Sequence, residues 1–285
     1  MNSEIKDVLL NGSTVDIALR DGKIASISPA VGTAQQVLLP LPVDPHVHLD
    51  KTFTANRCKP EKPGLFGAIE AMAKDALTWN EIDLRERIGQ ALTEAYRNGM
   101  SAMRSHVDWV QEEAPLAWSV LGEMAQDWRG KVDIQRSSLT PLNMLGDVEF
   151  GEAIASRVYR DREVMGCFVY RNENVDALLE QVFIYASRYE LMLDFHVDEG
   201  LEPEAAAFDR IVELTRHFRM SGRVLCGHAC SLSIRPEVEV SRIISEAAES
   251  GIALTILPTT NLWLQDNQNG VTPRLRGPAP MQELR

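Results

Sequence analysis

Apolar segments that recur roughly every 30 residues predict an α/β fold, a (β/α)8 TIM-type barrel that is incomplete at its C-terminal end. These segments alternate with amphipathic helical stretches, an arrangement typical of parallel strands joined by crossover helices. Seven strand segments are found, and an eighth would be due near residue 285, where the sequence stops. The length of 285 residues accommodates one such barrel together with a small additional element.

The first 36 residues differ from the rest because apolar and polar residues alternate there with a period of two. Two such stretches, 15–20 and 23–27, are separated by Asp21-Gly22, a pair typical of tight hairpin turns. We therefore expect a small β element over residues 1–36 and the barrel over residues 37–285.

The elements of the barrel follow one another in a regular order. The expected strands are the apolar segments 37–46, 101–107, 132–139, 164–170, 191–197, 224–229 and 252–258. The expected helices include the amphipathic segments 82–96, 114–128, 175–189, 204–218 and 238–248. The gap after the first strand is about twice as long as the others and holds an extra segment, 56–75, with Pro60, Pro63 and Gly64.

The composition is that of a globular protein, with 45% hydrophobic and 25% charged residues. The net charge of −12 argues against nucleic acid or an anionic membrane as the main partner, because both attract basic surfaces. No apolar run approaches the ~20 residues of a membrane span, and the polar N-terminus is unlike a signal peptide. The four cysteines are irregularly spaced, which favours reduced thiols. We expect a cytoplasmic protein, and the sequence leaves a homo-oligomer open.

Five of the six histidines lie at or near the C-terminal ends of expected strands: His46, His48, His106, His196 and His228. In a barrel, these strand ends form the active-site face. His46 and His48 are two residues apart, so they point the same way along a strand. Imidazoles gathered on one rim favour a transition-metal site over scattered packing roles.

Polar residues near the same strand ends indicate metal-assisted hydrolysis. Glu199 follows His196 by three positions, where a carboxylate can take a proton from water and return it to a leaving group. Capping of the next helix is the alternative role for Glu199, although Asp198 and Glu202 would serve equally. His228 is expected either as a ligand or as a neutral donor that polarises the substrate.

Other candidates carry less of the argument. His106 is expected to support the site and to pair with Asp108 rather than to bind metal directly. Asn261, which follows the seventh strand, is a candidate for the site. The spacing of Cys226 and Cys230 would allow metal binding, but their apolar neighbours favour core packing.

Five segments, taken in order, resemble the amidohydrolase superfamily. They are Asp44-Pro45-His46-Val47-His48-Leu49-Asp50, Arg104-Ser105-His106-Val107-Asp108, His196-Val197-Asp198-Glu199, Gly227-His228-Ala229 and Pro258-Thr259-Thr260-Asn261-Leu262. Within the superfamily, the chain is most similar to the bacterial cytosine deaminase group, which includes aminohydrolases of triazine breakdown. The similarity runs from the N-terminal hairpin to the last residue, and the ordered set is far more specific than His-x-His alone.

The resemblance implies a mononuclear site for one divalent metal ion, Fe²⁺ or Zn²⁺. His46, His48 and His196 match the three histidine ligands of the family. Glu199 matches its acid/base residue, and His228 matches its sixth-strand histidine. The family also places half of a small β-sandwich at each terminus, which is consistent with the expected hairpin.

Two departures from the family pattern affect activity and specificity. The remaining family ligand, an aspartate at the end of strand eight, has no match up to Arg285. We therefore expect the polypeptide as given to bind metal weakly and to lack full activity, which a comparison with a longer polypeptide would test. Cytosine deaminases also carry a glutamine just after a proline at the end of strand three, where Leu142 follows Pro141 here. Leucine cannot replace the hydrogen bonds of an amide, which argues against cytosine itself.

The sequence thus predicts hydrolytic deamination of a small aminated heterocycle, namely a cytosine-like pyrimidine, a triazine or a related cyclic amidine, with release of ammonia. Leu65, which resembles a leucine bordering the family's pocket, Leu142 and Asn261 are the expected substrate contacts. A metallophosphatase barrel is one alternative, for which Lys51 and Arg104 offer thin support as phosphate ligands. An inactive, truncated barrel that acts as a binding protein is the other.

Overall fold

The structure, a computed structural model, describes residues 2–285 and contains two compact units. The first extends to Pro42 and the second is Val43–Arg285. The division lies beyond position 36, where the patterning changes, because β4 (Gln36–Val37) still pairs with β1 (Asn2–Leu10) of the first unit. None of the helices in residues 2–285 combines the length and the apolar character that crossing a bilayer requires.

The first unit is a four-stranded sheet in the order β3-β2-β1-β4. The predicted hairpin is confirmed: β2 (Ser13–Arg20) and β3 (Lys23–Pro29) are antiparallel and joined by Asp21-Gly22. Both turn residues have positive φ angles of 51° and 74°, as a primed turn requires. The small core of this sheet consists of Val8, Val15 and Ile17.

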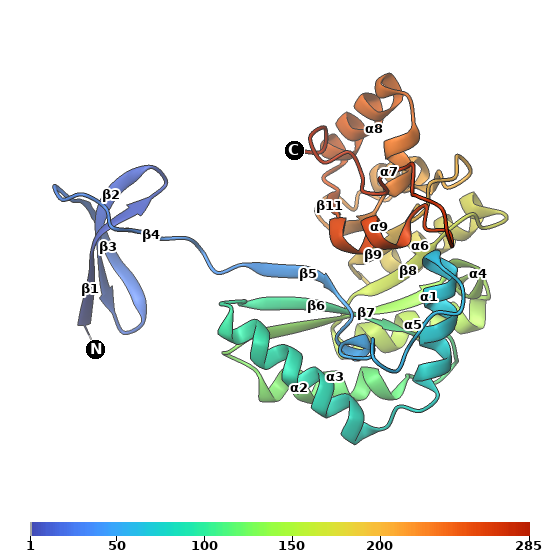
Figure 1. Cartoon of the computed structure of the whole chain (residues 1–285), viewed down its shortest axis with the longest axis horizontal. Helices are drawn as coiled ribbons and strands as arrows, with labels where there is room; N and C mark the ends of the chain where they lie inside the picture. The colour runs from blue at the N-terminus through green and yellow to red at the C-terminus, as the bar shows by residue number, and fades with distance from the viewer. Residues whose placement is uncertain (1) are drawn as a thin grey trace. The chain divides into compact units, whose positions relative to one another are not determined.

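The second unit is a nearly closed barrel of seven parallel strands in the order β11-β10-β9-β8-β7-β6-β5 (Figure 1). Its strands are β5 (Val43–Val47), β6 (Ala102–Asp108), β7 (Asp133–Pro141), β8 (Met165–Val169), β9 (Leu193–Val197), β10 (Val224–His228) and β11 (Ala253–Thr255). The sheet is curled, since the ring of His46 on β5 lies where a side chain on Gly227 of β10 would project: a Cβ there would stand 2.7 Å from His46 Cε1. The predicted (β/α) barrel architecture is confirmed.

Helices alternate with these strands, as the sequence pattern predicts. They are α1 (Gly64–Ala76), α2 (Glu81–Arg97), α3 (Leu116–Asp127), α4 (Leu142–Leu145), α5 (Val148–Asp161), α6 (Val175–Arg188), α7 (Ala207–His217), α8 (Glu237–Ser250) and α9 (Pro258–Leu264). Helix α2 illustrates the local sequence features that form these helices. The Asn80 side chain caps its first turn by accepting a hydrogen bond from the backbone N–H of Asp83. Its apolar residues Leu84, Ile88 and Leu92 recur every fourth position and are fully buried.

Two segments differ from the expected elements because of prolines and a glycine. The strand expected over 37–46 is split into β4 and β5, since Pro40 and Pro42 lie between them and lack the N–H group that a sheet needs. Segment 56–75, for which the sequence predicts only an extra segment, holds all but the last residue of helix α1. Pro63 and Gly64 stand at its start, where they set the entry of the helix rather than interrupt it.

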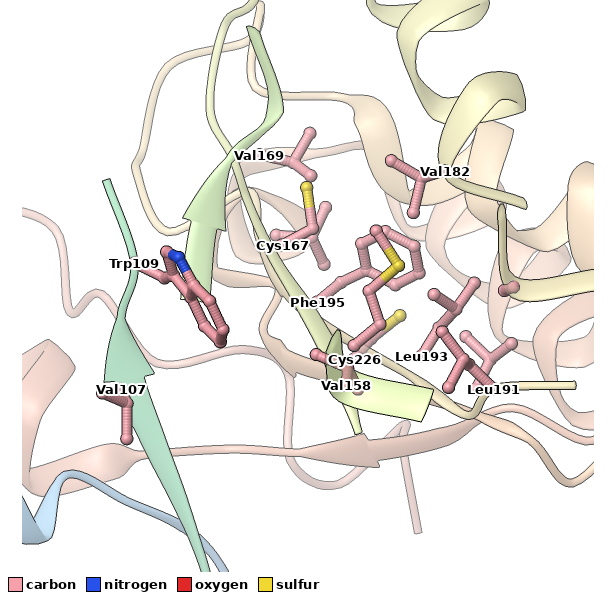
Figure 2. Packing of buried hydrophobic residues seen from close by; sticks show 14 of the residues in the cluster. Val107, Trp109, Val158, Cys167, Val169, Val182, Leu191, Leu193, Phe195 and Cys226 are labelled. Carbon is pink, nitrogen blue, oxygen red and sulfur yellow. The ribbon is translucent and has the colours of Figure 1, made fainter. Parts of the chain in front are cut away.

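Side chains that are register partners on neighbouring barrel strands form one row, which packs against the helices. The next residue along each strand therefore faces the inside of the barrel. Cys167, Phe195 and Cys226 are register partners on β8, β9 and β10. Figure 2 shows them near Val182 of α6, and all are fully buried. Because neighbours along a strand face opposite sides, Phe168 and His196 point into the barrel. The predicted core role of Cys226 and Cys230 is confirmed: both are buried free thiols.

Candidate active site

The barrel brings the histidines of four strands together at one end. The ligand nitrogens of His46, His48, His106 and His196 all lie within 4.8 Å of one another. The ring of His46 is centred 4.3 Å from the rings of both His106 and His196. The Nε2 atoms of His48 and His196 are 3.2 Å apart. The fifth expected histidine, His228, joins the group with its ring 5.0 Å from that of His46.

The chemistry of this cluster fits a divalent transition metal. Burial lowers the pKa of His46, His48 and His196 well below the ordinary value for histidine, so the rings are neutral. Both ring nitrogens of His46, and Nδ1 of His48 and of His196, have no hydrogen-bond partner although they are buried. Neutral imidazoles with unused nitrogens are the form in which histidine binds metal, and a metal ion would satisfy these nitrogens.

His106 has a different partner from the one expected from the sequence. Its Nε2 lies 3.0 Å from Asp194 Oδ1, and its Nδ1 lies 3.3 Å from the carbonyl oxygen of Val47. Asp108 instead accepts a hydrogen bond of 2.8 Å from Lys51. The expected His106–Asp108 pair is therefore wrong, because the partner comes from across the barrel interior on β9, a contact that strand patterning cannot reveal. His106 also lies within the metal-ligating distance of the other three histidines.

Glu199 and His228 form a second pair beside the cluster. Glu199 Oε1 is 3.2 Å from His228 Nδ1, and both side chains are almost fully buried. Burial raises the pKa of Glu199 to about 8, so its carboxyl group can hold or release a proton near neutral pH. Burial lowers the pKa of His228 to about 3, so this ring is neutral. Capping of the following helix falls to Asp198, which accepts from the backbone N–H groups of Ala207 and Phe208.

A cavity of about 470 Å³ opens over these groups. His46, His48, His196, Glu199 and His228 line part of it. Its remaining walls are largely apolar and come from α1, the ends of β7 and β8, and α9; they include Leu65, Phe66, Ile69, Met72, Phe168 and Leu264. A flat organic molecule bound there would have these apolar side chains against it and the polar cluster at one end.

The three residues proposed to contact substrate occupy different places. Leu65 lines the cavity. Leu142 is fully buried in the hydrophobic core, while the next residue, Asn143, lines the cavity. Asn261 is also fully buried, and it contacts Glu199 and His228 rather than lining the cavity. The sequence does hold a signal for Asn143. Helix α4 begins directly after Pro141, so the rule that alternate residues of a strand face the same side no longer applies to Leu142 and Asn143.

The two cations considered as phosphate ligands are already paired. Arg104 Nη1 lies 2.7 Å from Asp194 Oδ2, and Arg104 Nε donates to Gln135. Lys51 Nζ lies 2.8 Å from Asp108 Oδ1. Lys51 is the one lysine or arginine among the described residues that line the cavity. The site therefore does not favour a phosphate monoester.

Comparison with known proteins gives relatives of related chemistry. No family model matches the chain. It is 31% identical over 280 residues to a pterin deaminase of Rhizobium rhizogenes, covering 94% of this chain and 64% of that protein. It is 23% identical over 217 residues to N-isopropylammelide isopropyl amidohydrolase of a Pseudomonas species, covering 74% of this chain and 54% of that protein. The chain thus spans somewhat less than two thirds of the curated relatives.

Solved structures of the same fold extend the comparison. The crystal structure of 5-methylcytosine deaminase from Klebsiella pneumoniae, liganded with 5-fluorocytosine, superposes with a TM-score of 0.86 at 22% identity, over 100% of this chain and 72% of that one. N-isopropylammelide isopropylaminohydrolase from Burkholderia multivorans gives a TM-score of 0.72 at 22% identity, over 89% and 67%. The chain therefore shares the fold of these deaminases and amidohydrolases, and it is similar in sequence to the pterin deaminase.

Proposed function

We propose that this barrel catalyses metal-dependent hydrolytic deamination of a small aminated heterocycle and releases ammonia. One observation carries the proposal: neutral histidines with unused nitrogens and Glu199, whose pKa is raised to about 8, line the same largely apolar cavity. The relatives support it, because their names describe deamination of pterin and 5-methylcytosine and hydrolysis of N-isopropylammelide. The reaction class is the addition of water to a ring carbon, followed by loss of the amino group.

His46, His48 and His196 would hold one divalent ion, Fe²⁺ or Zn²⁺. When bound, such an ion would lower the pKa of a coordinated water and polarise the substrate. The lone pairs needed for this are available because burial keeps the three rings neutral. Asp194 would fix the orientation of the His106 ring through its contact with the ring Nε2.

Glu199 would move the protons of the reaction. In its ionised form it accepts a proton from the attacking water and passes this proton to the ring nitrogen. It then takes the proton of the hydroxyl group that has been added to the ring carbon and gives it to the amino group, which leaves as ammonia. Its raised pKa suits both tasks, because neither form is strongly disfavoured near neutral pH. His228, neutral and 3.2 Å from the carboxylate, would orient the attacking water.

The substrate ring would lie between apolar walls. Leu65 and Phe66 from α1 and Phe168 from β8 line the cavity and present surfaces suited to a flat heterocycle. Asn143 would offer its amide to the polar edge of the ring, in place of the glutamine that cytosine deaminases carry nearby. The metallophosphatase alternative is not favoured because Lys51 and Arg104 are paired.

The cellular setting is proposed on weaker but separate grounds. All four cysteines are free thiols, three of them buried, as is usual in a reducing compartment such as the cytoplasm. The proposed partner is a small heterocycle, because the cavity lies within the barrel and is lined mainly by apolar side chains.

Replacement of the proton carrier tests the proposal. A Glu199→Gln variant keeps the size of the side chain but cannot exchange a proton, so turnover should fall by roughly 10²–10⁴-fold. The histidines are untouched, so bound zinc or iron, measured by elemental analysis, should stay at the wild-type level. The assay would follow ammonia release from a panel of aminopyrimidines, aminotriazines and aminopterins. Wild-type turnover in the variant would contradict the role of Glu199.

A further inference from the structure

Helix α9 and the residue that caps its C-terminal end carry two amide side chains, and both contact Glu199. Asn261 Nδ2 lies 3.4 Å from Glu199 Oε1, and Gln265 Nε2 donates a 2.7 Å hydrogen bond to the Glu199 carbonyl oxygen. The two amides are four positions apart and therefore lie on the same side of the helical turn. Asn261 is fully buried and Gln265 is nearly so. The carboxylate and the backbone of Glu199 are thus fixed from the same direction.

Asn261 also contacts His228. Its Nδ2 lies 3.2 Å from His228 Nδ1, so the same amide nitrogen faces the carboxylate and the imidazole. An amide nitrogen can only donate, and two acceptors lie within reach of it here. With the amide turned the other way, its oxygen would face the Glu199 carboxyl group, and in the ionised form of Glu199 these would be two acceptors without a proton between them.

This contact decides which nitrogen of the neutral His228 ring carries the proton. A carboxylate beside Nδ1, as Glu199 Oε1 is at 3.2 Å, would by itself favour a proton on Nδ1. The N–H of Asn261 requires a lone pair on Nδ1 instead, which leaves the proton on Nε2. His228 Nε2 is buried without a partner in the protein, and the residue lines the cavity.

We propose that Asn261 is a positioning residue that holds His228 in the tautomer protonated at Nε2, so that the ring presents an N–H donor to the cavity. The catalytic consequence rests on the proposed function. A donor at this place stabilises negative charge on the attacking oxygen and leaves Glu199 as the group that accepts the proton. Asn261 would thereby separate the roles of two groups that stand 3.2 Å apart.

The tautomer is measured directly by long-range ¹H–¹⁵N NMR on the full chain labelled at the histidine rings, without metal. The two ring nitrogens differ strongly in ¹⁵N shift according to which one is protonated, and His228 is assigned by the signals missing in His228→Gln. In the wild type, the proton should be on Nε2. In Asn261→Asp, a group that only accepts replaces the donor, so the proton should move to Nδ1.

A neighbouring amide supplies the matched control. Asn267 lies just beyond α9, is exposed, and donates to the carbonyl oxygen of Trp263 rather than to the site. Asn267→Asp makes the same chemical change and should leave His228 protonated at Nε2. A wild-type proton on Nδ1, or a proton that stays on Nε2 in a folded Asn261→Asp variant, would overturn the proposal. The wild-type measurement decides the matter even if the variant does not fold.

Kinetics add a readout that separates this proposal from the function itself. In Asn261→Ala, with zinc bound, kcat should fall by about 10–100-fold with little change in KM, because the lost donor acts mainly in the transition state. If the wild type deaminates no heterocycle but shows the Nε2 tautomer, the proposed function fails and the positioning role stands. If it deaminates with the Nδ1 tautomer, the reverse holds.

Discussion

Burial determines the charge of the individual residues at this site. The same loss of water makes His46 and His228 neutral and makes it easier for Glu199 to keep its proton, because each charged form is poorly solvated. Residue types alone would give ordinary pKa values, so the sequence identifies the chemical groups but not their protonation. Their positions inside the barrel supply the shifts.

The raised pKa of Glu199 predicts a pH-dependent cost to stability. The pKa rises from 4.5 to about 8 on folding, chiefly because of burial. Between these values, the folded form binds more protons than the unfolded form, so the free energy of unfolding falls as pH increases. Glu199→Gln removes this dependence. In metal-free protein, the variant should gain stability relative to wild type between pH 5 and pH 8, by a few kcal/mol at most (on the order of 1.4 kcal/mol per pKa unit).

Urea unfolding at both pH values measures this difference. His217 offers a control, because His217→Gln alters a titratable residue outside the cluster, at the end of α7. The stability difference between His217→Gln and wild type should not show the change between pH 5 and pH 8 that is expected for Glu199→Gln. An equal stability difference between Glu199→Gln and wild type at pH 5 and pH 8 would contradict the buried, proton-holding carboxyl.

Asn143 should govern substrate binding. Asn143→Leu removes the amide from the cavity, and the lost hydrogen bonds should raise KM for the best heterocycle about tenfold, roughly 1.4 kcal/mol. Leu142→Val is the matched control, because Leu142 lies in the core and does not line the cavity. That variant should lose some stability and keep its KM. A KM effect larger in the Leu142 variant than in the Asn143 variant would contradict this assignment.

At the scale of elements, close packing of strands limits which residues are tolerated. Gly166 on β8 stands so near β7 that an added Cβ would be 1.8 Å from the Ser138 carbonyl oxygen. Gly166→Ala should therefore lower the free energy of unfolding by roughly 1–3 kcal/mol or more. Gly89 in α2 has room, since its nearest neighbour would be Met124 Cε at 3.7 Å. Gly89→Ala should be neutral or stabilising, and equal effects of both changes in urea unfolding would contradict the close packing.

At the scale of the whole molecule, residues 2–285 form two separate hydrophobic cores. One contains Val8, Val15 and Ile17, and the other belongs to residues 43–285. Between them, Leu39 and Leu41 are exposed and flank Pro40 in a segment without strand pairing. We expect limited proteolysis to cut within 38–42 and to leave a resistant fragment that begins near Val43.

Mass spectrometry of the digest identifies the cleavage site. Leu121 and Leu179 serve as internal controls, because bonds beside these fully buried residues should be cut much more slowly than bonds beside Leu39 and Leu41. First cleavage inside the barrel, or no cleavage before residue 43, would contradict the division into two units.

The sequence by itself determined the class of fold and most of the candidate site. Hydrophobic periodicity is a local property, so it indicates strands, helices and the hairpin at Asp21-Gly22 without knowledge of their partners. The rule that strand ends form one face then gathers His46, His48, His196 and Glu199. Pro63 and Gly64 did not reveal helix α1, because the same residue types can begin a helix or interrupt one.

Only the tertiary structure decided which side chains meet across the barrel. It paired His106 with Asp194 instead of Asp108, and it turned Leu142 into the core and Asn143 toward the cavity. It also placed Asn261 against Glu199 and His228. These contacts depend on the curl of the sheet and on helix entry angles, which no local pattern encodes.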